Sequence, residues 1–119
     1  GQFNDPTGIA LDADNDVWVV DSGNNRIEEF NPQGVFMRSV GQSGYGNGYL
    51  SYPNGIAVDA SGDVWVVDDG NRRVEEFSGT GNFLSTFNTV GSGQPTGIAI
   101  GGGNTLAQII HGVSDSARN

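Results

Sequence analysis

The sequence predicts an all-β fold built from a repeated unit of four short strands. Residues 8–30 (GIALDADNDVWVVDSGNNRIEEF) recur as residues 55–77 (GIAVDASGDVWVVDDGNRRVEEF), and 17 of these 23 aligned positions are identical. Apolar residues in both segments alternate with a period near two, which is typical of strands and excludes a solenoid of helices. The chain also contains 20 glycines, which suit the many tight turns between short antiparallel strands.

The first repeat divides into four strands separated by turn residues. An apolar run at Gly8–Asp12 ends in an acidic turn, and Val17–Asp21 is rich in the β-branched and aromatic residues that strands favour. Arg26–Phe30 forms the third strand. The sequence Asn31-Pro32-Gln33-Gly34 fits a type I turn, with Pro second and Gly fourth. Val35–Val40 then completes an antiparallel meander.

The second repeat follows the same order after a longer Gly-rich connection, residues 41–52. Its four predicted strands are Gly55–Asp59, Val64–Asp68, Arg73–Phe77 and Asn82–Phe87. Four strands in about 40–45 residues, repeated along a chain, are typical of β-propeller blades. We therefore expect a first blade in residues 1–50, a second in residues 51–94 and a partial third blade with a divergent tail in residues 95–119.

The third copy opens like the others and then diverges. Residues 95–100 (PTGIAI) match residues 6–11 (PTGIAL), but the Asp and Trp of the following strand are absent. The tail places apolar residues at Leu106, Ile109, Ile110 and Val113, which is the spacing of one helix face. The alternative is a degenerate second strand, and the sequence leaves both alternatives open for residues 106–110.

The repeated pattern resembles the NHL repeat. In both copies the motifs P-x-G-I-A-[LV]-D, V-W-V-V-D and G-N-x-R-[IV]-x-x-F follow in order at matched spacing, over residues 6–30 and 53–77. The resemblance implies a β-propeller, usually of six blades. It implies less about function, because the family includes protein-interaction, RNA-binding and receptor sensor domains and a metal-dependent lyase.

Two blades and a partial third do not close a ring, so blade faces and strand edges stay open. Three outcomes follow: a piece of a longer propeller, a ring closed by self-association, or open head-to-tail growth into a filament. We therefore expect a homo-oligomer or homopolymer, or other protein partners.

Charge and composition exclude several function classes. The net charge is −9, with no lysine and five arginines, which disfavours nucleic-acid binding. No apolar run reaches the roughly 18 residues that a membrane span needs. The chain has no cysteine and one histidine, His111, which cannot supply the several histidines of the lyase relatives. The sequence thus predicts a non-enzymatic structural or interaction module; the alternatives are a fragment of a larger extracellular ligand-binding or sensor propeller and a degenerate enzyme of the lyase or lactonase type. With the family resemblance we expect an extracellular or cell-surface location in a prokaryote.

One motif could bind a metal. Asp12, Asp14 and Asp16 resemble the opening of a calcium loop, since Ca²⁺ prefers several carboxylate oxygens close together. Asp and Asn are also ordinary turn residues, and the second repeat weakens the set to Asp59, Ser61 and Asp63. A structural turn and a weak calcium site are both open, and no other cofactor is expected.

A second group of residues is expected at contacts within or between blades. Asp21 and Asp68 end the second strands and are expected to accept hydrogen bonds from backbone or from the third-strand arginine. Adjacent glutamates in the third strands should point to opposite faces, so one of each pair should meet an arginine across blades or lie on a solvated edge. Tyrosines in the connection form a contact surface or cover the blade. The interface candidates are Trp18, Trp65, Arg26, Arg73, Glu29, Glu76, Tyr45, Tyr49 and Tyr52.

Overall fold

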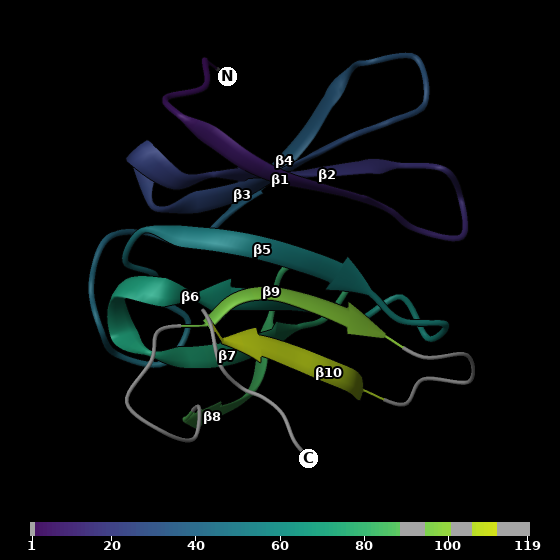
Figure 1. The fold of residues 1–119 in the computed structure, drawn as a ribbon. Helices are drawn as coiled ribbons and strands as arrows, with labels where there is room; N and C mark the ends of the chain where they lie inside the picture. The colour runs from purple at the N-terminus through teal and green to yellow at the C-terminus, as the bar shows by residue number, and fades with distance from the viewer. Residues whose placement is uncertain (1, 89–94, 101–105, 112–119) are drawn as a thin grey trace.

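Three antiparallel β-sheets lie side by side in the computed structural model, which describes residues 2–88, 95–100 and 106–111 (Figure 1). The first sheet contains β1 (Pro6–Leu11), β2 (Val17–Asp21), β3 (Arg26–Phe30) and β4 (Phe36–Val40). The second sheet contains β5 (Pro53–Val58), β6 (Val64–Asp68), β7 (Arg73–Phe77) and β8 (Phe83–Asn88). The third sheet pairs β9 (Pro95–Ile100) with β10 (Leu106–His111). The predicted all-β fold is confirmed.

The first strand of each four-stranded sheet begins earlier than the sequence pattern indicates. β1 and β5 start at Pro6 and Pro53, which pair with Asp21 and Asp68 across a bulge. Both strands lie at one end of their sheet's strand order. Proline is tolerated at the first residue of an edge strand because its missing N–H is not needed there.

The segment after the divergence is a strand and not a helix. Residues 106–111 form β10, which pairs antiparallel with β9 and places Ile109 opposite Ile98. The helix alternative is therefore wrong for these residues, because pairing with β9 supplies the tertiary contacts that override local propensity. Val113 and the rest of the tail lie outside the described residues.

The hydrophobic core lies between the sheets. Figure 1 shows β5 between the first sheet and β9. The core joins one face of the first sheet to one face of the second; its buried members are Trp18, Val20, Ile27, Val40, Leu50, Ile56, Val64, Val66 and Phe77. Neither four-stranded sheet therefore buries its apolar residues without a neighbour.

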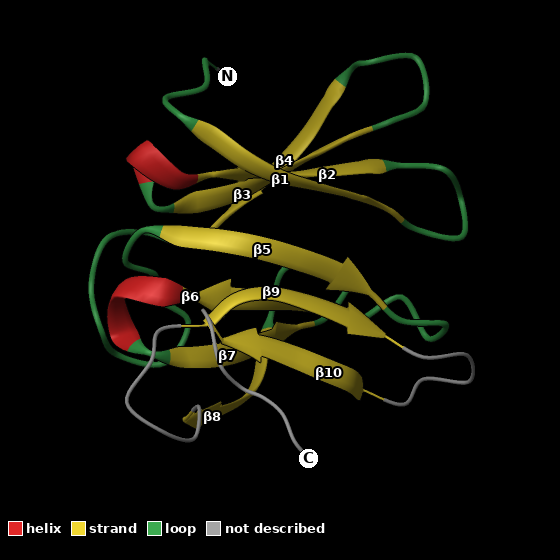
Figure 2. Cartoon of the chain, in the orientation of Figure 1, coloured by secondary structure: helices red, strands yellow, loops and turns green. Residues whose placement is uncertain are grey.

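Two short 3-10 helices mark the same end of both four-stranded sheets (Figure 2). They span Ser22–Asn24 and Asp69–Asn71, between the second and third strands. Each ends at a residue in the left-handed region, Asn25 and Arg72, both with φ of 55°. In the part of the chain that the structure describes, no helix has the length and apolar character needed to cross a membrane.

Candidate functional site

Asp21 fixes the segment that enters the first sheet. One oxygen of its carboxylate accepts the backbone N–H of Asn4 at 2.6 Å, and the other accepts Asn24 Nδ2 and Arg26 Nε, each at 2.9 Å. Burial opposes ionisation of Asp21, but these hydrogen bonds outweigh it and lower the pKa of the carboxyl. The carboxylate therefore acts as a structural anchor at the end of β2, as expected from the sequence.

Asp68 repeats this arrangement at the end of β6. It accepts the Ser51 N–H at 2.7 Å and both Asn71 Nδ2 and Arg73 Nε at 2.9 Å. The two sheets thus hold their entering segments by the same set of contacts, 47 positions apart. Any other blade of this sequence type is expected to enter its sheet in the same way.

Arg73 also fastens the connection between the two sheets. Its terminal nitrogens donate to the carbonyl oxygens of Tyr45 at 2.8 Å, Gly46 at 2.9 Å and Tyr49 at 2.8 Å. Among the described residues, Arg26 makes one such contact, to the carbonyl oxygen of Gln2 at 2.9 Å. The Arg73 side chain is 9% exposed and that of Arg26 is 26% exposed, so the second arginine is the more completely enclosed.

Among the described residues, Arg26 and Arg73 pair with glutamates of their own strands and not across sheets, which corrects one of the two alternatives that the sequence allowed. Arg26 lies 3.2 Å from Glu28, and Arg73 lies 3.1 Å from Glu75. Residues two apart in a strand point to the same face, so each arginine can reach the glutamate of its own strand. Burial raises the pKa of Glu75 to about 7, against the opposing charge of Arg73.

Glu29 and Glu76 each face a turn rich in carboxylates. Glu29 groups with Asp12 and Asp16, and Glu76 groups with Asp59 and Asp63, with ligand oxygens in each set within 4.8 Å of one another. Asp14, the middle residue of the predicted calcium motif, is not in the first set; its backbone N–H donates to the Asp12 carboxylate at 2.9 Å. The structure thus brings a strand glutamate into the acidic group in place of Asp14.

The first acidic group already has internal partners. Asp12 accepts the Asp16 N–H at 3.0 Å and Trp18 Nε1 at 3.2 Å, and Arg38 Nε lies 2.7 Å from Glu29. Burial raises the pKa of Glu29, and a hydrogen bond with Asp16 raises it further, although Arg38 opposes both. The carboxylates build the turn and could together contact one hard cation, and calcium binding stays a prediction.

The second acidic group lacks the arginine. Ser85 Oγ donates to Glu76 at 2.8 Å at the position where the first sheet places Arg38. Burial raises the pKa of Glu76; the Ser85 hydrogen bond opposes this shift, and Asp63 adds to it. The two acidic groups are therefore built on equivalent positions, but only the first has an arginine beside its glutamate.

The two tryptophans have different surroundings. Trp18 is 1% exposed and belongs to the core between the first and second sheets. Trp65 is half-buried, its ring centroid lies 6.4 Å from that of Phe87, and its Nε1 donates to Asp59 at 3.0 Å. Neither ring is presented as a flat, open stacking surface in this arrangement.

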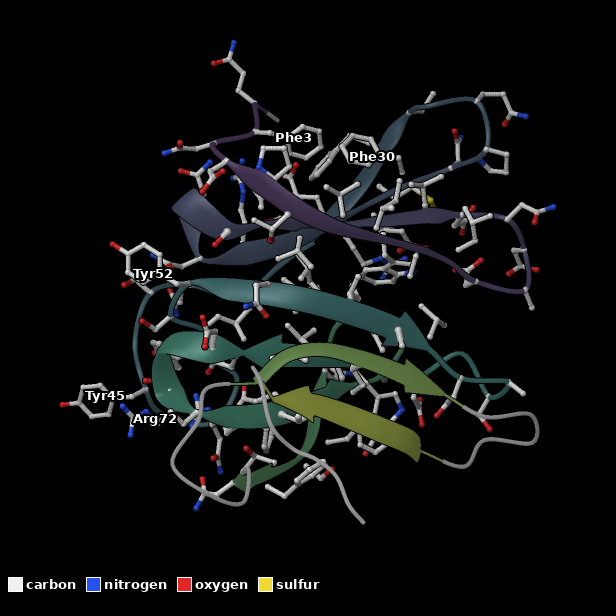
Figure 3. All side chains as sticks on the ribbon, in the orientation of Figure 1. Phe3, Phe30, Tyr45, Tyr52 and Arg72 are labelled. Atoms are coloured by element: carbon white, nitrogen blue, oxygen red, sulfur yellow. The ribbon has the colours of Figure 1, made fainter. Side chains whose placement is uncertain are left out.

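The tyrosines lie on the rim formed by the connection. Tyr45 is 84% exposed and Tyr52 is 64% exposed, and Figure 3 shows the Tyr45 ring directed away from the sheets. Tyr49 packs against Gly44, where an added Cβ would lie 2.5 Å from its ring. The backbone of Tyr52 is in the left-handed region, with φ of 49°, and its N–H donates to Asn25 Oδ1 at 2.8 Å.

An apolar face of the first sheet is open, as the incomplete ring predicts, but the sequence reasoning did not identify its residues. Val17 lies opposite Phe30, Ile9 opposite Val19, and Phe30 opposite Phe36. Residues paired directly across strands point to the same face. We call this the open face: Phe3, Ile9, Leu11, Val17, Val19, Phe30 and Phe36. Aligning the two repeats strand by strand, with attention to which face each position occupies, could have found it.

Comparisons with known proteins identify the repeat. The NHL repeat model matches residues 3–30 and 50–77. The chain is 40% identical over 52 residues to the protein brain tumor of Drosophila melanogaster, covering 44% of this chain and 5% of that protein.

Solved structures share the fold. Virginiamycin B lyase of Staphylococcus aureus matches with 22% identity and a TM-score of 0.66, over 83% of this chain and 32% of that one. A gluconolactonase of Xanthomonas campestris matches with 21% identity and a TM-score of 0.64, over 84% and 32%. The chain thus spans about a third of the length of each enzyme, and the likeness concerns the fold alone.

Each matched segment covers the first three strands of a four-stranded sheet. The first and second sheets are therefore NHL-type propeller blades, and the chain carries two NHL repeats that form part of a β-propeller.

Proposed function

We propose that this chain is a non-enzymatic interaction module whose blades are completed by association with further blades, most simply those of other copies. The observation that carries the proposal is the position of the core, which lies between sheets and not within one. A blade needs a neighbour on each apolar face, and the open face of the first sheet lacks one among the described residues. Repetition of the same contact between copies gives a closed ring or an open filament.

The composition supports a role without catalysis. The sequence supplies one histidine and no cysteine, and the buried carboxylates of Asp21 and Asp68 are held by arginines at the ends of the second strands. Asp21, Asp68 and Arg73 anchor chain segments.

The test is the molar mass of the purified chain, measured by light scattering over a range of concentrations. A discrete mass of about three chains supports a closed ring of six blades. A mass that rises steadily with concentration supports a head-to-tail filament. A monomer at every concentration refutes self-assembly.

One observation favours a second candidate, a piece of a larger extracellular ligand-binding or sensor propeller. The chain spans about a third of the solved propellers that it matches. In this case blades from the same polypeptide complete the ring. A monomer that unfolds with poor cooperativity, and that gains cooperativity when further blades are added, supports this candidate over self-assembly.

A further inference from the structure

The chain contains two Asn-Gly pairs in different structural settings. Asn47-Gly48 lies in the connection between the first and second sheets, and Asn54-Gly55 lies in β5. In such a pair the glycine nitrogen can attack the asparagine side chain, because glycine has no side chain to hinder the approach and its backbone rotates freely. The same reactive dipeptide therefore occurs once in a loop and once in a sheet.

Asn47 and Gly48 form the centre of an exposed turn. The Tyr49 N–H donates to the Gly46 carbonyl oxygen at 3.0 Å and closes the turn. Gly48 has φ of 85°, the conformation that a type II turn requires at its third residue. Asn47 is exposed, so water can reach the product of an attack on its side chain.

Strand β7 holds this turn from its buried side. Arg73 donates to the carbonyl oxygens on either side of the pair, those of Gly46 at 2.9 Å and Tyr49 at 2.8 Å. The Gly48 N–H is directed toward the carboxyl group of Glu75. Attack of the Gly48 nitrogen on the Asn47 side chain therefore requires the turn to open.

Asn54-Gly55 is held by a whole sheet. Gly55 is buried and lies opposite Val67 in the ladder between β5 and β6, and Asn54 is half-buried. Reaction of Asn54 requires β5 to separate from β6, whereas reaction of Asn47 requires one turn to open. Opening of a loop costs less free energy than opening of a core strand. The structure therefore favours reaction at Asn47.

We propose that Asn47 is a modification site, at which spontaneous deamidation gives aspartate and isoaspartate, and that Arg73 sets the rate by holding the turn closed. The Gly48 nitrogen bonds to Asn47 Cγ, the bond from Cγ to Nδ2 breaks, and the amide group leaves as ammonia with the proton that the nitrogen releases. Water then opens the succinimide ring at either of its carbonyl carbons. One opening gives aspartate, and the other gives isoaspartate, in which the main chain runs through the side-chain carbonyl carbon.

The product changes the contacts of the connection. Isoaspartate adds one methylene to the main chain between Gly46 and Tyr49, so Arg73 cannot keep both carbonyl oxygens at their present distances. Either product adds a negative charge to a chain whose net charge is −9. Leu50, which is fully buried in the core between the sheets, directly follows Tyr49. Modification of Asn47 therefore loosens the connection beside the core.

The test follows both asparagines in one peptide. The purified chain is incubated at neutral pH and physiological temperature, and samples taken over time are digested with trypsin. Cleavage after Arg38 and Arg72 gives residues 39–72, which contain both Asn-Gly pairs, and fragment masses locate the deamidation. An isoaspartyl methyltransferase with a labelled methyl donor measures the isoaspartate.

In the folded chain Asn47 is expected to react about tenfold or more faster than Asn54, and in concentrated urea the two rates should converge. The urea measurement removes the structure and keeps the neighbouring residues, so it is the control for intrinsic reactivity. Equal rates in the folded chain, or a faster reaction of Asn54, overturn the assignment of the site. A difference that persists unchanged in urea overturns its structural basis.

Arg73→Lys tests the restraint on the turn. Asn47 is expected to react several times faster in this variant, because a lysine ammonium cannot hold both carbonyl oxygens, while Asn54 keeps its rate. Arg26→Lys, at the matching position of the first sheet, is the control and should leave both rates unchanged. An unchanged Asn47 rate in Arg73→Lys refutes the restraint. Equal acceleration of both asparagines also refutes it, because the whole second sheet then opens and not the turn alone.

Discussion

Val17 and Val64 offer a matched measurement of what a neighbouring blade contributes to stability. They are the same residue at the same position of the motif VWVVD, yet Val64 is fully buried and Val17 is half-buried on the open face. Replacing either with alanine changes strand propensity equally, so that term cancels in the comparison. The remaining difference measures burial by the neighbouring sheet.

The expected magnitudes follow from the packing. Val64→Ala removes two buried methyl groups, worth about 0.8 kcal/mol each, and leaves a cavity, so we expect a loss of about 2–3 kcal/mol. Val17→Ala removes partly hydrated atoms with no enclosed cavity, and we expect a loss below about 1 kcal/mol. The Val66→Ala and Val19→Ala pair repeats the comparison on the same face, two residues further along the strand.

Urea unfolding followed by tryptophan fluorescence measures both changes. With a slope of about 1–3 kcal/mol per molar urea, the two midpoints should differ by roughly 1 M. The unfolding is measured at a protein concentration at which light scattering shows a monomer. Equal losses for Val17→Ala and Val64→Ala in the monomer would contradict the assignment of an open face, because they require equal burial of both valines.

Three further predictions concern the anchors and the buried carboxylates. Arg73→Lys should lower the free energy of unfolding by about 1–3 kcal/mol and speed amide hydrogen exchange in residues 45–49, because a lysine ammonium cannot contact Asp68 and three carbonyl oxygens at once. Arg26→Lys is the control and should lower the free energy of unfolding by less; equal losses would be evidence against the difference in enclosure of the two arginines. The stability of the wild-type chain should fall as pH rises from about 4.5 to about 7, because Glu75 keeps its proton in the folded chain and releases it in the unfolded chain. Urea midpoints measured across this pH range should fall less steeply for Glu75→Gln, and an unchanged slope would contradict the role of Glu75. Asp59→Ala should lower the free energy of unfolding by about 1–3 kcal/mol and shift the fluorescence emission of Trp65, because the Asp59 carboxylate accepts hydrogen bonds from the Asp63 N–H and Trp65 Nε1. Asp14→Ala, at an exposed residue, is the control, and an unchanged emission in Asp59→Ala would count against the hydrogen bond to Trp65.

Local chemistry made the strands predictable. Val17–Asp21 and Arg26–Phe30 form strands at the predicted residues, because β-branched and aromatic runs between Asp- and Gly-rich turns leave few alternatives. The segment 106–110 was ambiguous because its apolar spacing suits a helix face, and only pairing with β9 decides it. The NHL motif predicted the blade, and the structure agrees.

The surroundings of a residue were harder to predict than its strand. Strand alternation in RIEEF already places Arg26 and Glu28 on one face, but the sequence did not reveal that Glu29 reaches Asp12 and Asp16, because that contact depends on how the strand packs beside the turn. Nor could the motif VWVVD distinguish Val17 from Val64, since identical residues are buried or open according to which sheet lies beside them. Local sequence determines the face of a strand, and the neighbouring blade determines its burial.

The open face carries mostly the same residues as the surface that the second sheet buries. A sheet face that stays exposed to solvent is expected to carry polar residues. On the open face Ile9, Val17, Val19 and Phe30 are instead identical to the residues that the second sheet buries at Ile56, Val64, Val66 and Phe77. Folding of the first sheet alone gives little reason for this identity, because Ile9 stays exposed in it and Val17, Val19 and Phe30 are only half-buried. Contact with a further blade does, since it makes the two surfaces equivalent in burial as well as in sequence.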